Sequence, residues 1–277
     1  MQQTTGAFQT PDKLNIFTIQ WLPDDTPKAV VIIVHGLGEH IGRYQHVAEA
    51  LVSAGYAVYG LDHRGHGRSN GKRVQVTSNT HFIDDLKQYF DTIRQEHDKD
   101  KIFILGHSMG SVISLQFALK YQNSLAGLIV TGTATDVGST VGPMLQSAAN
   151  VLHRILPHMP IGAPLPIAHL TNDKAIQEAT DNDALNHKGW TPISIAKYII
   201  DTGAMIQDNV QQLVLPILIM HGEDDRITPI SGSRIVHERV GSADKTLKTW
   251  DNMQHEIMNE IDRDQVIGDI IDWLENH

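Results

Sequence analysis

The segment Gly106-His107-Ser108-Met109-Gly110 constrains the fold of this 277-residue chain more than any other feature. It follows an apolar run at residues 101–105 and precedes an apolar pattern of helical spacing at residues 111–121. Glycine at both ends permits a tight turn, and a strained backbone at the central serine lifts its hydroxyl above the edge of a sheet. The pattern Gly-x-Ser-x-Gly between a strand and a helix therefore predicts a nucleophile elbow with Ser108 as the nucleophile.

Alternating strand and helix patterns on both sides of this turn predict a doubly wound, mostly parallel α/β sheet. Short apolar runs indicate strands, and apolar residues at helical spacing indicate the helices between them. The expected strands are residues 14–22, 29–34, 56–61, 101–105, 125–131, 215–220 and 245–250. The expected helices are residues 44–54, 79–97, 111–121 and 261–274.

One stretch lacks this alternation and predicts an inserted helical cap at residues 137–210, within a core of residues 1–136 and 211–277. The cap begins apolar, becomes proline-rich near residues 157–166, turns polar, and ends with a helical pattern at 193–206. We expect it to cover the carboxyl edge of the sheet, where ligands bind in such folds.

A serine nucleophile requires a base, and the base requires an acid that orients it. In the chain order serine, acid, histidine, the acid is expected just after a late strand. Residues 222–225, Gly-Glu-Asp-Asp, follow such a strand, and Asp225 is the preferred acid because it is the fourth residue of a Gly-x-x-Asp loop. Asp224, as a turn residue or a partner of Arg226, and Asp136, after an earlier strand, are the alternatives.

The base is expected on the loop after the last strand, and His255 lies on that loop. His237 falls within an expected helix, His221 precedes the acid loop, and His277 is terminal. These three histidines are interpreted as packing or solvent-exposed residues. The sequence therefore predicts His255 as the general base.

Three motifs resemble the monoacylglycerol lipases and their bacterial relatives, also called lysophospholipase-like or serine aminopeptidase S33-type α/β-hydrolases. They are His35-Gly-Leu-Gly-Glu-His-Ile-Gly-Arg-Tyr44, Asp62-His-Arg-Gly-His-Gly-Arg-Ser69 and Gly106-His-Ser-Met-Gly110, with shorter matches at residues 181–185 and 244–248. The elbow is common to many hydrolases, whereas the first motif is much more selective. The resemblance covers about residues 12–275 and implies an α/β-hydrolase fold.

The resemblance implies an activity and a set of catalytic positions. The implied activity is hydrolysis of a monoacylglycerol ester to glycerol and a free fatty acid. Ser108, Asp225 and His255 match the family triad, whereas Leu37 and Met109 match the residues whose backbone N–H groups hold the oxyanion.

The resemblance also implies the polar end of a substrate site. Glu39, Arg43 and His107 match positions where the family lines the glycerol-accepting end, and a purely structural ion pair and histidine are the other interpretation. Thr180 stands where related lipases often carry tyrosine, and Ser111 stands where the elbow helix usually continues with glycine.

Apolar cap residues offer a place for an acyl chain, although such stripes usually pack a cap helix on its neighbours. The main candidates are Met144, Leu145, Leu152 and Ile155, with Ala148, Leu156, Ile161 and Leu165 as further ones. If exposed, the same residues predict transient contact with membrane surfaces, where lipid substrates reside.

Composition excludes several classes of function. A formal net charge of −10 opposes a nucleic-acid partner, because phosphate binding needs a basic face. The absence of cysteine excludes disulfides and thiolate catalysis, and no metal site or cofactor is expected. No signal peptide or membrane span is evident, so we expect a soluble cytoplasmic protein that is at most peripheral to membranes. The sequence does not specify an oligomeric state.

Other activities would use the same catalytic groups. A lysophospholipase or a short-chain carboxylesterase would differ only in its substrate. An aminopeptidase would need a carboxylate in the cap for the substrate amine, and Asp173, Glu178, Asp181 and Asp183 are available. A non-catalytic hydrolase-like receptor is the remaining alternative. Such a receptor would not need all three residue types of the triad, so their presence in the expected order argues against it.

Overall fold

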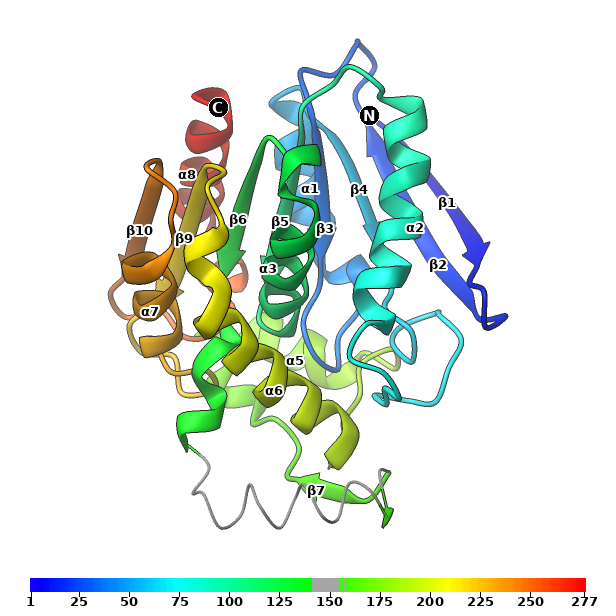
Figure 1. Cartoon of the computed structure of the whole chain (residues 1–277), viewed down its shortest axis with the longest axis vertical. Helices are drawn as coiled ribbons and strands as arrows, with labels where there is room; N and C mark the ends of the chain where they lie inside the picture. The colour runs from blue at the N-terminus through cyan, green and yellow to red at the C-terminus, as the bar shows by residue number, and fades with distance from the viewer. Residues whose placement is uncertain (141–154, 157) are drawn as a thin grey trace.

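A mostly parallel sheet forms the centre of the protein (Figure 1). The computed structural model describes residues 1–140, 155–156 and 158–277. The strands of the sheet are β1 (Gln2–Gln9), β2 (Asn15–Leu22), β3 (Val30–Val34), β4 (Ala57–Leu61), β5 (Ile102–His107), β6 (Gly127–Thr131), β9 (Ile217–Gly222) and β10 (Lys245–Trp250). Their order is β1-β2-β4-β3-β5-β6-β9-β10, with β2 antiparallel to both of its neighbours and the other pairs parallel. Because the chain fills positions on both sides of β3, the sheet is doubly wound, as predicted.

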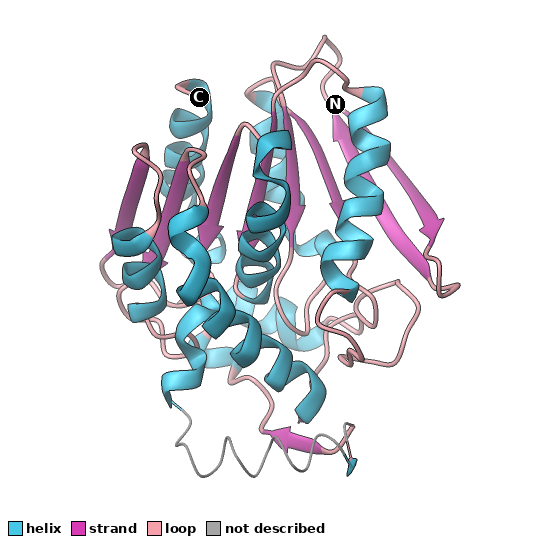
Figure 2. Cartoon of the chain, in the orientation of Figure 1, coloured by secondary structure: helices cyan, strands magenta, loops and turns pink. Residues whose placement is uncertain are grey.

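Helices cover both faces of the sheet (Figure 2). One face packs against α1 (Gln45–Ser53) and α8 (Arg263–Glu275), and the other against α2 (His81–Glu96), α3 (Met109–Tyr121) and α7 (Ser231–Arg239). Successive side chains of a strand point to opposite faces. In β3, Val30, Ile32 and Val34 therefore join one apolar cluster, whereas Val31 and Ile33 join the other. This two-sided burial explains the uninterrupted apolar run in the sequence.

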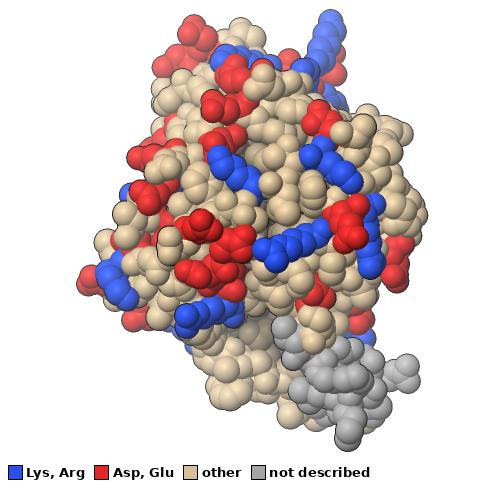
Figure 3. All heavy atoms as spheres, turned by 90° about the vertical axis from the view of Figure 1, so that its left-hand side faces the viewer, with Lys and Arg blue, Asp and Glu red and all other residues tan. Residues whose placement is uncertain are grey.

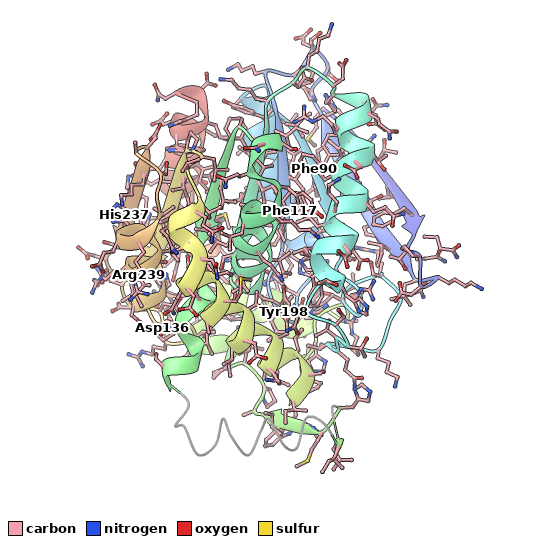
Figure 4. The ribbon with its side chains drawn as sticks, in the orientation of Figure 1. Phe90, Phe117, Asp136, Tyr198, His237 and Arg239 are labelled. Atoms are coloured by element: carbon pink, nitrogen blue, oxygen red, sulfur yellow. The ribbon has the colours of Figure 1, made fainter. Side chains whose placement is uncertain are left out.

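The helices on one face also pack on each other. Phe90 of α2 and Phe117 of α3 point toward each other in Figure 4, and their ring centroids lie 5.4 Å apart. Phe82 of α2 in turn contacts Tyr198, at 5.0 Å between centroids. These contacts bury the apolar side that the sequence predicts for α2.

The chain leaves the sheet between β6 and β9, at the carboxyl ends of the parallel strands (Figure 1). This segment contains α5 (Lys174–Asn182), α6 (Ile193–Asn209) and a small antiparallel pair, β7 (Pro160–Gly162) with β8 (Thr191–Pro192). α6 packs on α3, and Tyr198 donates a hydrogen bond to Gln116 Oε1 of α3 (2.9 Å). The added segment therefore lies at the sheet edge where the sequence places a ligand site.

Among the elements that have no counterpart in the expected strands and helices are β1 and α5. β1 is a polar, exposed edge strand, and its sequence Gln-Gln-Thr-Thr-Gly-Ala-Phe-Gln lacks apolar alternation. α5 lies in a polar stretch, and its N-terminus is formed by Asp173, whose carboxylate accepts hydrogen bonds from the N–H groups of Ala175 and Ile176. Among the described residues, none of the helices combines the length and apolar character needed to cross a bilayer.

Candidate active site

Ser108 lies at the turn between β5 and α3 with φ 54° and ψ −120°. This left-handed backbone costs about 1–3 kcal/mol for a residue with a side chain, and the surrounding structure must maintain it. A Cβ on Gly106 would overlap the Ser114 hydroxyl, and a Cβ on Gly110 would overlap the Val34 carbonyl oxygen. Glycine is therefore required at both ends of the elbow for steric reasons.

Ser111 has a specific place in this elbow. Its hydroxyl donates to the carbonyl of Ser108 (2.5 Å) and accepts from the N–H of Ala134 (3.2 Å). A glycine here would offer neither bond. Ser111 thus links the strained turn to the segment that follows β6.

The three triad candidates, far apart in the sequence, lie within hydrogen-bond distance of one another. His255 Nε2 lies 2.8 Å from Ser108 Oγ, and His255 Nδ1 lies 2.7 Å from Asp225 Oδ2. Asp225 follows β9, and His255 lies on the loop after β10. Because a carboxylate only accepts hydrogen bonds, Nδ1 carries the ring proton and Nε2 of the neutral ring accepts from the serine hydroxyl.

Electrostatics around His255 favour its charged form. Burial alone would lower the pKa of His255, but the Asp225 charge and hydrogen bond outweigh burial and raise it above its ordinary value. Burial acts in the opposite direction on Asp225, yet the neighbouring His255 and the hydrogen bond from His221 lower the pKa of Asp225 strongly. The pair is thus poised to stabilise an imidazolium.

The loop after β9 holds Asp225 firmly. Its Oδ1 accepts from the N–H groups of Ile227 (2.7 Å) and Thr228 (2.9 Å), and Thr228 Oγ1 donates to Oδ2 (2.8 Å). The two alternatives for the acid lie elsewhere. Asp224 is exposed, and Asp136 accepts a hydrogen bond from Ser231 on α7.

The loop after β3 lies directly against the elbow. A Cβ on Gly36 would sit only 3.1 Å from Ser108 Cβ, so the backbone that leads into Leu37 runs beside the serine. Met109 begins α3, and the first N–H groups of a helix have no partner within it. The predicted oxyanion donors therefore both lie close to Ser108. Met109 follows it in the chain, and Leu37 lies on the neighbouring loop after β3.

His35 supports this loop through two hydrogen bonds. Its Nδ1 donates to the Gly36 carbonyl (2.8 Å), and its Nε2 accepts from the N–H of His63 (2.9 Å). Burial lowers the pKa of His35 well below its ordinary value, which is consistent with a neutral ring that both donates and accepts.

Arg43 joins the loop after β3 to the loop of the base. Its Nη1 lies 2.7 Å from Glu39 Oε2, and its two terminal nitrogens each lie 2.7 Å from an oxygen of Glu256. Nη2 also donates to Thr180 Oγ1 of α5 (2.9 Å). Glu39 Oε1 accepts from the N–H of Gly36 (2.5 Å), so this ion-pair cluster also fixes the loop that carries Leu37.

His107 lies between this cluster and the triad. Its Nδ1 is 2.9 Å from Thr131 Oγ1, and its ring centroid is 4.8 Å from that of His255. Burial and the nearby positive charge of His255 lower the pKa of His107 to about 3. His107 is thus a neutral, hydrogen-bonded residue at the wall of the site.

A pocket with a cavity volume of about 210 Å³ opens above Ser108 and His255. Its polar wall includes Glu39, Arg43, Thr180 and Glu256, and its apolar wall includes Pro164, Leu165, Ile167 and Leu170. Of the four cap carboxylates considered for an amine, Asp181 lines this pocket; Asp183 pairs with His40 and Asp173 with Arg263.

The acyl-chain candidates of the cap divide into two groups. Met144, Leu145, Ala148 and Leu152 lie outside the described residues. Ile155 is 71% exposed and Leu156 is 52% exposed, and neither is among the described residues that line the pocket. Leu165 does line it. Apolar character alone does not tell which of these side chains faces inward.

The cap segment is tied to the core by hydrogen bonds from residues 180–188. The N–H of His187 donates to the carbonyl of Gly38 (2.7 Å), and His40 Nε2 lies 2.7 Å from Asp183 Oδ2. Arg73 also donates to the carbonyl of Leu185. These bonds hold the cap against the loop that carries Leu37.

Three residues at the site were not anticipated from the sequence. Glu256 directly follows the base, so proximity to His255 was an available signal. Thr228 and His221 flank Asp225 in sequence, yet nothing in their spacing distinguishes a hydrogen-bond partner of the acid from a packing residue. Within the described ranges, no group of three or more His, Asp or Glu side chains is arranged to hold a metal ion.

Comparisons with known proteins agree with this architecture. The family model described as serine aminopeptidase, S33 matches residues 25–262. The chain is 35% identical to a monoacylglycerol lipase of Mycolicibacterium smegmatis, over 93% of this chain and 91% of that protein. It is 29% identical to a monoglyceride lipase of Mus musculus, over 94% of this chain and 86% of that protein.

Solved structures show the same similarity. A monoacylglycerol lipase of Paleococcus ferrophilus matches with a TM-score of 0.80 and 27% identity, over 99% of this chain and 98% of that chain. A soluble variant of the monoglyceride lipase of Saccharomyces cerevisiae, in complex with a substrate analog, matches with a TM-score of 0.86 and 25% identity, over 98% and 94%. The chain therefore belongs to the serine aminopeptidase S33 family of α/β-hydrolases.

Proposed function

We propose that this protein is a carboxylic-ester hydrolase that cleaves monoacylglycerols to glycerol and a free fatty acid. The observation that carries the proposal is the hydrogen-bonded series Ser108–His255–Asp225 at the floor of a pocket with one polar and one apolar wall. Such a pocket suits an ester that joins a small polyol to an alkyl chain. The similarity to proteins named monoacylglycerol lipases supports the same substrate class.

The acylation step follows from the hydrogen bonds. His255 Nε2 takes the proton of Ser108 as Oγ attacks the ester carbonyl carbon. The charge that develops on the carbonyl oxygen is held by the backbone N–H groups of Leu37 and Met109. Asp225 stabilises the imidazolium that forms, because its carboxylate is buried against Nδ1.

The leaving group and water complete the reaction. The His255 imidazolium protonates the departing glycerol oxygen, which leaves the fatty acid esterified to Ser108. A water molecule, activated by the neutral His255, then hydrolyses this acyl-enzyme and releases the acid. Every proton in both steps passes through the Nε2 atom.

The polar wall determines the expected alcohol. Arg43 is engaged by two carboxylates, Glu39 and Glu256, so the cluster leaves no unpaired positive charge for an anionic head group. Hydroxyl groups of glycerol can hydrogen-bond to its carboxylate oxygens, whereas a phosphate would be repelled by them. This arrangement favours a neutral head group over a lysophospholipid.

We also propose that this enzyme is cytoplasmic and that it contacts membrane surfaces transiently through the cap. Exposed apolar side chains occur there at Ile155, Leu156, Met159, Ile161 and Trp190. In the view of Figure 3, the described atoms at the end of the molecule that carries the cap are mostly uncharged. An exposed apolar group of this kind suits a lipid interface.

The substrate assignment is tested by comparing kcat/KM for monoacylglycerols from C8 to C18, lysophosphatidylcholine, p-nitrophenyl butyrate and aminoacyl-anilides. We expect a long-chain monoacylglycerol to be the preferred substrate. Preference for p-nitrophenyl butyrate would make the protein a short-chain esterase, and preference for lysophosphatidylcholine a lysophospholipase. Turnover of the anilides would favour an aminopeptidase that uses Asp181. Failure of a fluorophosphonate to label Ser108 would favour a non-catalytic receptor.

The membrane contact is tested by sedimentation with phosphatidylcholine vesicles. The double variant Ile155→Ser/Trp190→Ser is expected to bind vesicles several-fold more weakly than the wild type. Val214→Ser is the control, because the exposure of Val214 (66%) lies between those of Ile155 (71%) and Trp190 (57%), but Val214 precedes β9 at the opposite edge of the sheet. Equal binding by all three proteins would contradict the proposed contact.

A further inference from the structure

His221 is a buried histidine that the proposed chemistry does not use. It lies near the end of β9, and its side chain has no exposed surface. Its Nε2 lies 3.1 Å from Asp225 Oδ2 and 3.2 Å from the carbonyl oxygen of Thr228. Its Nδ1 lies 2.8 Å from Ser233 Oγ, on α7. The sequence alone indicates a packing or solvent-exposed residue, whereas these contacts show a more specific placement.

The two neighbours of Nε2 determine where the proton of His221 resides. A carboxylate oxygen and a backbone carbonyl oxygen can only accept hydrogen bonds. Nε2 must therefore carry a proton, whatever the charge of the ring, and it donates that proton toward Asp225 and Thr228. In the neutral ring, Nδ1 then accepts from the hydroxyl of Ser233. One tautomer is consequently selected by groups on both sides of the ring.

His221 donates to the same carboxylate oxygen that orients the base. Asp225 Oδ2 receives His255 Nδ1 at 2.7 Å, Thr228 Oγ1 at 2.8 Å and His221 Nε2 at 3.1 Å. The Asp225 side chain is fully buried, so no solvent can replace a donor that is removed. A rotation of the carboxylate would lose the contact to His255.

We propose that His221 is a positioning residue for the acid of the triad. It holds the Asp225 carboxylate in line with His255 Nδ1, and Ser233 fixes its ring in the donating tautomer. The hydrogen-bonded series then runs from Ser233 on α7 through His221, Asp225 and His255 to Ser108. This inference rests on the proposed serine-hydrolase chemistry, although it does not depend on the identity of the ester.

The test compares three substitutions with p-nitrophenyl butyrate as substrate. His221→Phe removes the donor and keeps a ring; we expect kcat to fall about 10- to 100-fold with little change in KM, the range for a hydrogen bond to a buried charge. His221→Gln keeps a side-chain N–H donor and is expected to recover most of that loss. Ser233→Ala removes only the hydroxyl that fixes the tautomer, and we expect a loss of severalfold.

A spectroscopic readout separates positioning from packing. The proton shared by His255 Nδ1 and Asp225 gives a low-field NMR signal, identified by its absence in Asp225→Asn. His221→Phe is expected to shift this signal upfield or broaden it, and His221→Gln to restore it. His237→Phe is the matched control, because His237 lies on the outer flank of α7 (Figure 4); its kcat and signal should equal those of the wild type.

Clear outcomes would overturn the proposal. A His221→Phe enzyme within about twofold of the wild type in kcat, with an unchanged low-field signal, would do so. A loss of kcat that leaves the signal unchanged and is not recovered by glutamine would assign His221 to packing. If His221→Phe does not fold, Ser233→Ala decides, and a wild-type kcat and an unchanged low-field signal in that variant would refute the proposal. Wild-type turnover of the nitrophenyl ester but not of monoacylglycerols would defeat only the proposed substrate.

Discussion

Asp224 and Asp225 are neighbours in the chain, but their side chains lie in opposite environments. Asp225 is fully buried at the side chain and lies 2.7 Å from His255 Nδ1, whereas Asp224 is exposed to solvent. The backbone N–H of Asp224 donates to the carbonyl of Met253, which orients the loop so that only the second carboxylate faces the base. Two adjacent, chemically identical groups therefore have different roles.

This difference predicts the result of two matched substitutions. Asp225→Asn should lower kcat about 10⁴-fold, because an amide at this position no longer holds His255 in the tautomer that accepts the serine proton. Asp224→Asn should leave kcat within about twofold of the wild type. Steady-state kinetics on one ester measures both, and a larger loss in Asp224→Asn would reverse the assignment of the acid.

Ser108→Ala is expected to lower kcat about 10⁶-fold, as found when a triad nucleophile is lost. The free energy of unfolding should not fall, because alanine fills the same tight turn with a smaller side chain. The measurement is turnover of p-nitrophenyl butyrate, with a fluorophosphonate as an independent probe. Labelling of the alanine variant at wild-type level would place the nucleophile elsewhere.

The pKa of His255 predicts the pH dependence of the reaction. The neutral ring is the base, and Asp225 raises its pKa above the ordinary value of 6.5, so kcat/KM should fall as the pH drops through a value above 6.5. In Asp225→Asn the carboxylate charge is absent and burial alone lowers the pKa, so the acidic limb should move to lower pH. A limb that does not move between the two enzymes would contradict this account.

Arg43 predicts an effect on stability. Arg43→Met leaves Glu39 and Glu256 buried without their cationic partner, so the free energy of unfolding should fall by about 3–5 kcal/mol. Arg234→Met is the control: Arg234 is 58% exposed at the side chain and lies 3.2 Å from Glu223, a surface pair that contributes about 0–1 kcal/mol. Denaturant unfolding measures both, and equal losses would show that burial of the cluster is unimportant.

Two glycines in helices predict opposite effects of the same substitution. Gly110→Ala places a methyl group against the backbone of Val34 and should destabilise the fold by about 1–3 kcal/mol while displacing Ser108. Gly268 in α8 has nothing near its absent side chain, so Gly268→Ala should stabilise the protein by about 0.5–1 kcal/mol. Thermal unfolding and activity measured together distinguish the two positions.

The sequence predicts the core of the fold well because burial leaves a strong pattern. Strands such as β3 are buried on both faces, and their apolar runs are continuous. β1 is not predicted, because it is an exposed edge strand without an apolar pattern. It is held by backbone pairing to β2, which the side-chain sequence does not indicate. α5 is not predicted for a similar reason, since Thr180 is its buried residue and the rest of the helix is polar or partly exposed.

The candidate site is predictable where a motif specifies it and unpredictable where tertiary contacts do. Ser108, Asp225 and His255 follow from the elbow and from their places after particular strands. Nothing local indicates that Glu256 shares Arg43 with Glu39, because the two loops meet only in the folded chain. The exposure of Ile155 likewise depends on which way the cap turns.

The bond from the His187 N–H to the Gly38 carbonyl has a consequence for substrate entry. Gly38 adjoins Leu37, so any outward swing of the cap that separates residue 187 from the core also removes a restraint from the loop that must receive the oxyanion. Entry of a lipid past the cap and the position of the oxyanion-binding loop would then be coupled. With the cap displaced, the backbone N–H of Leu37 would be held less firmly. Return of the cap over the ester would restore the position that this N–H needs for turnover.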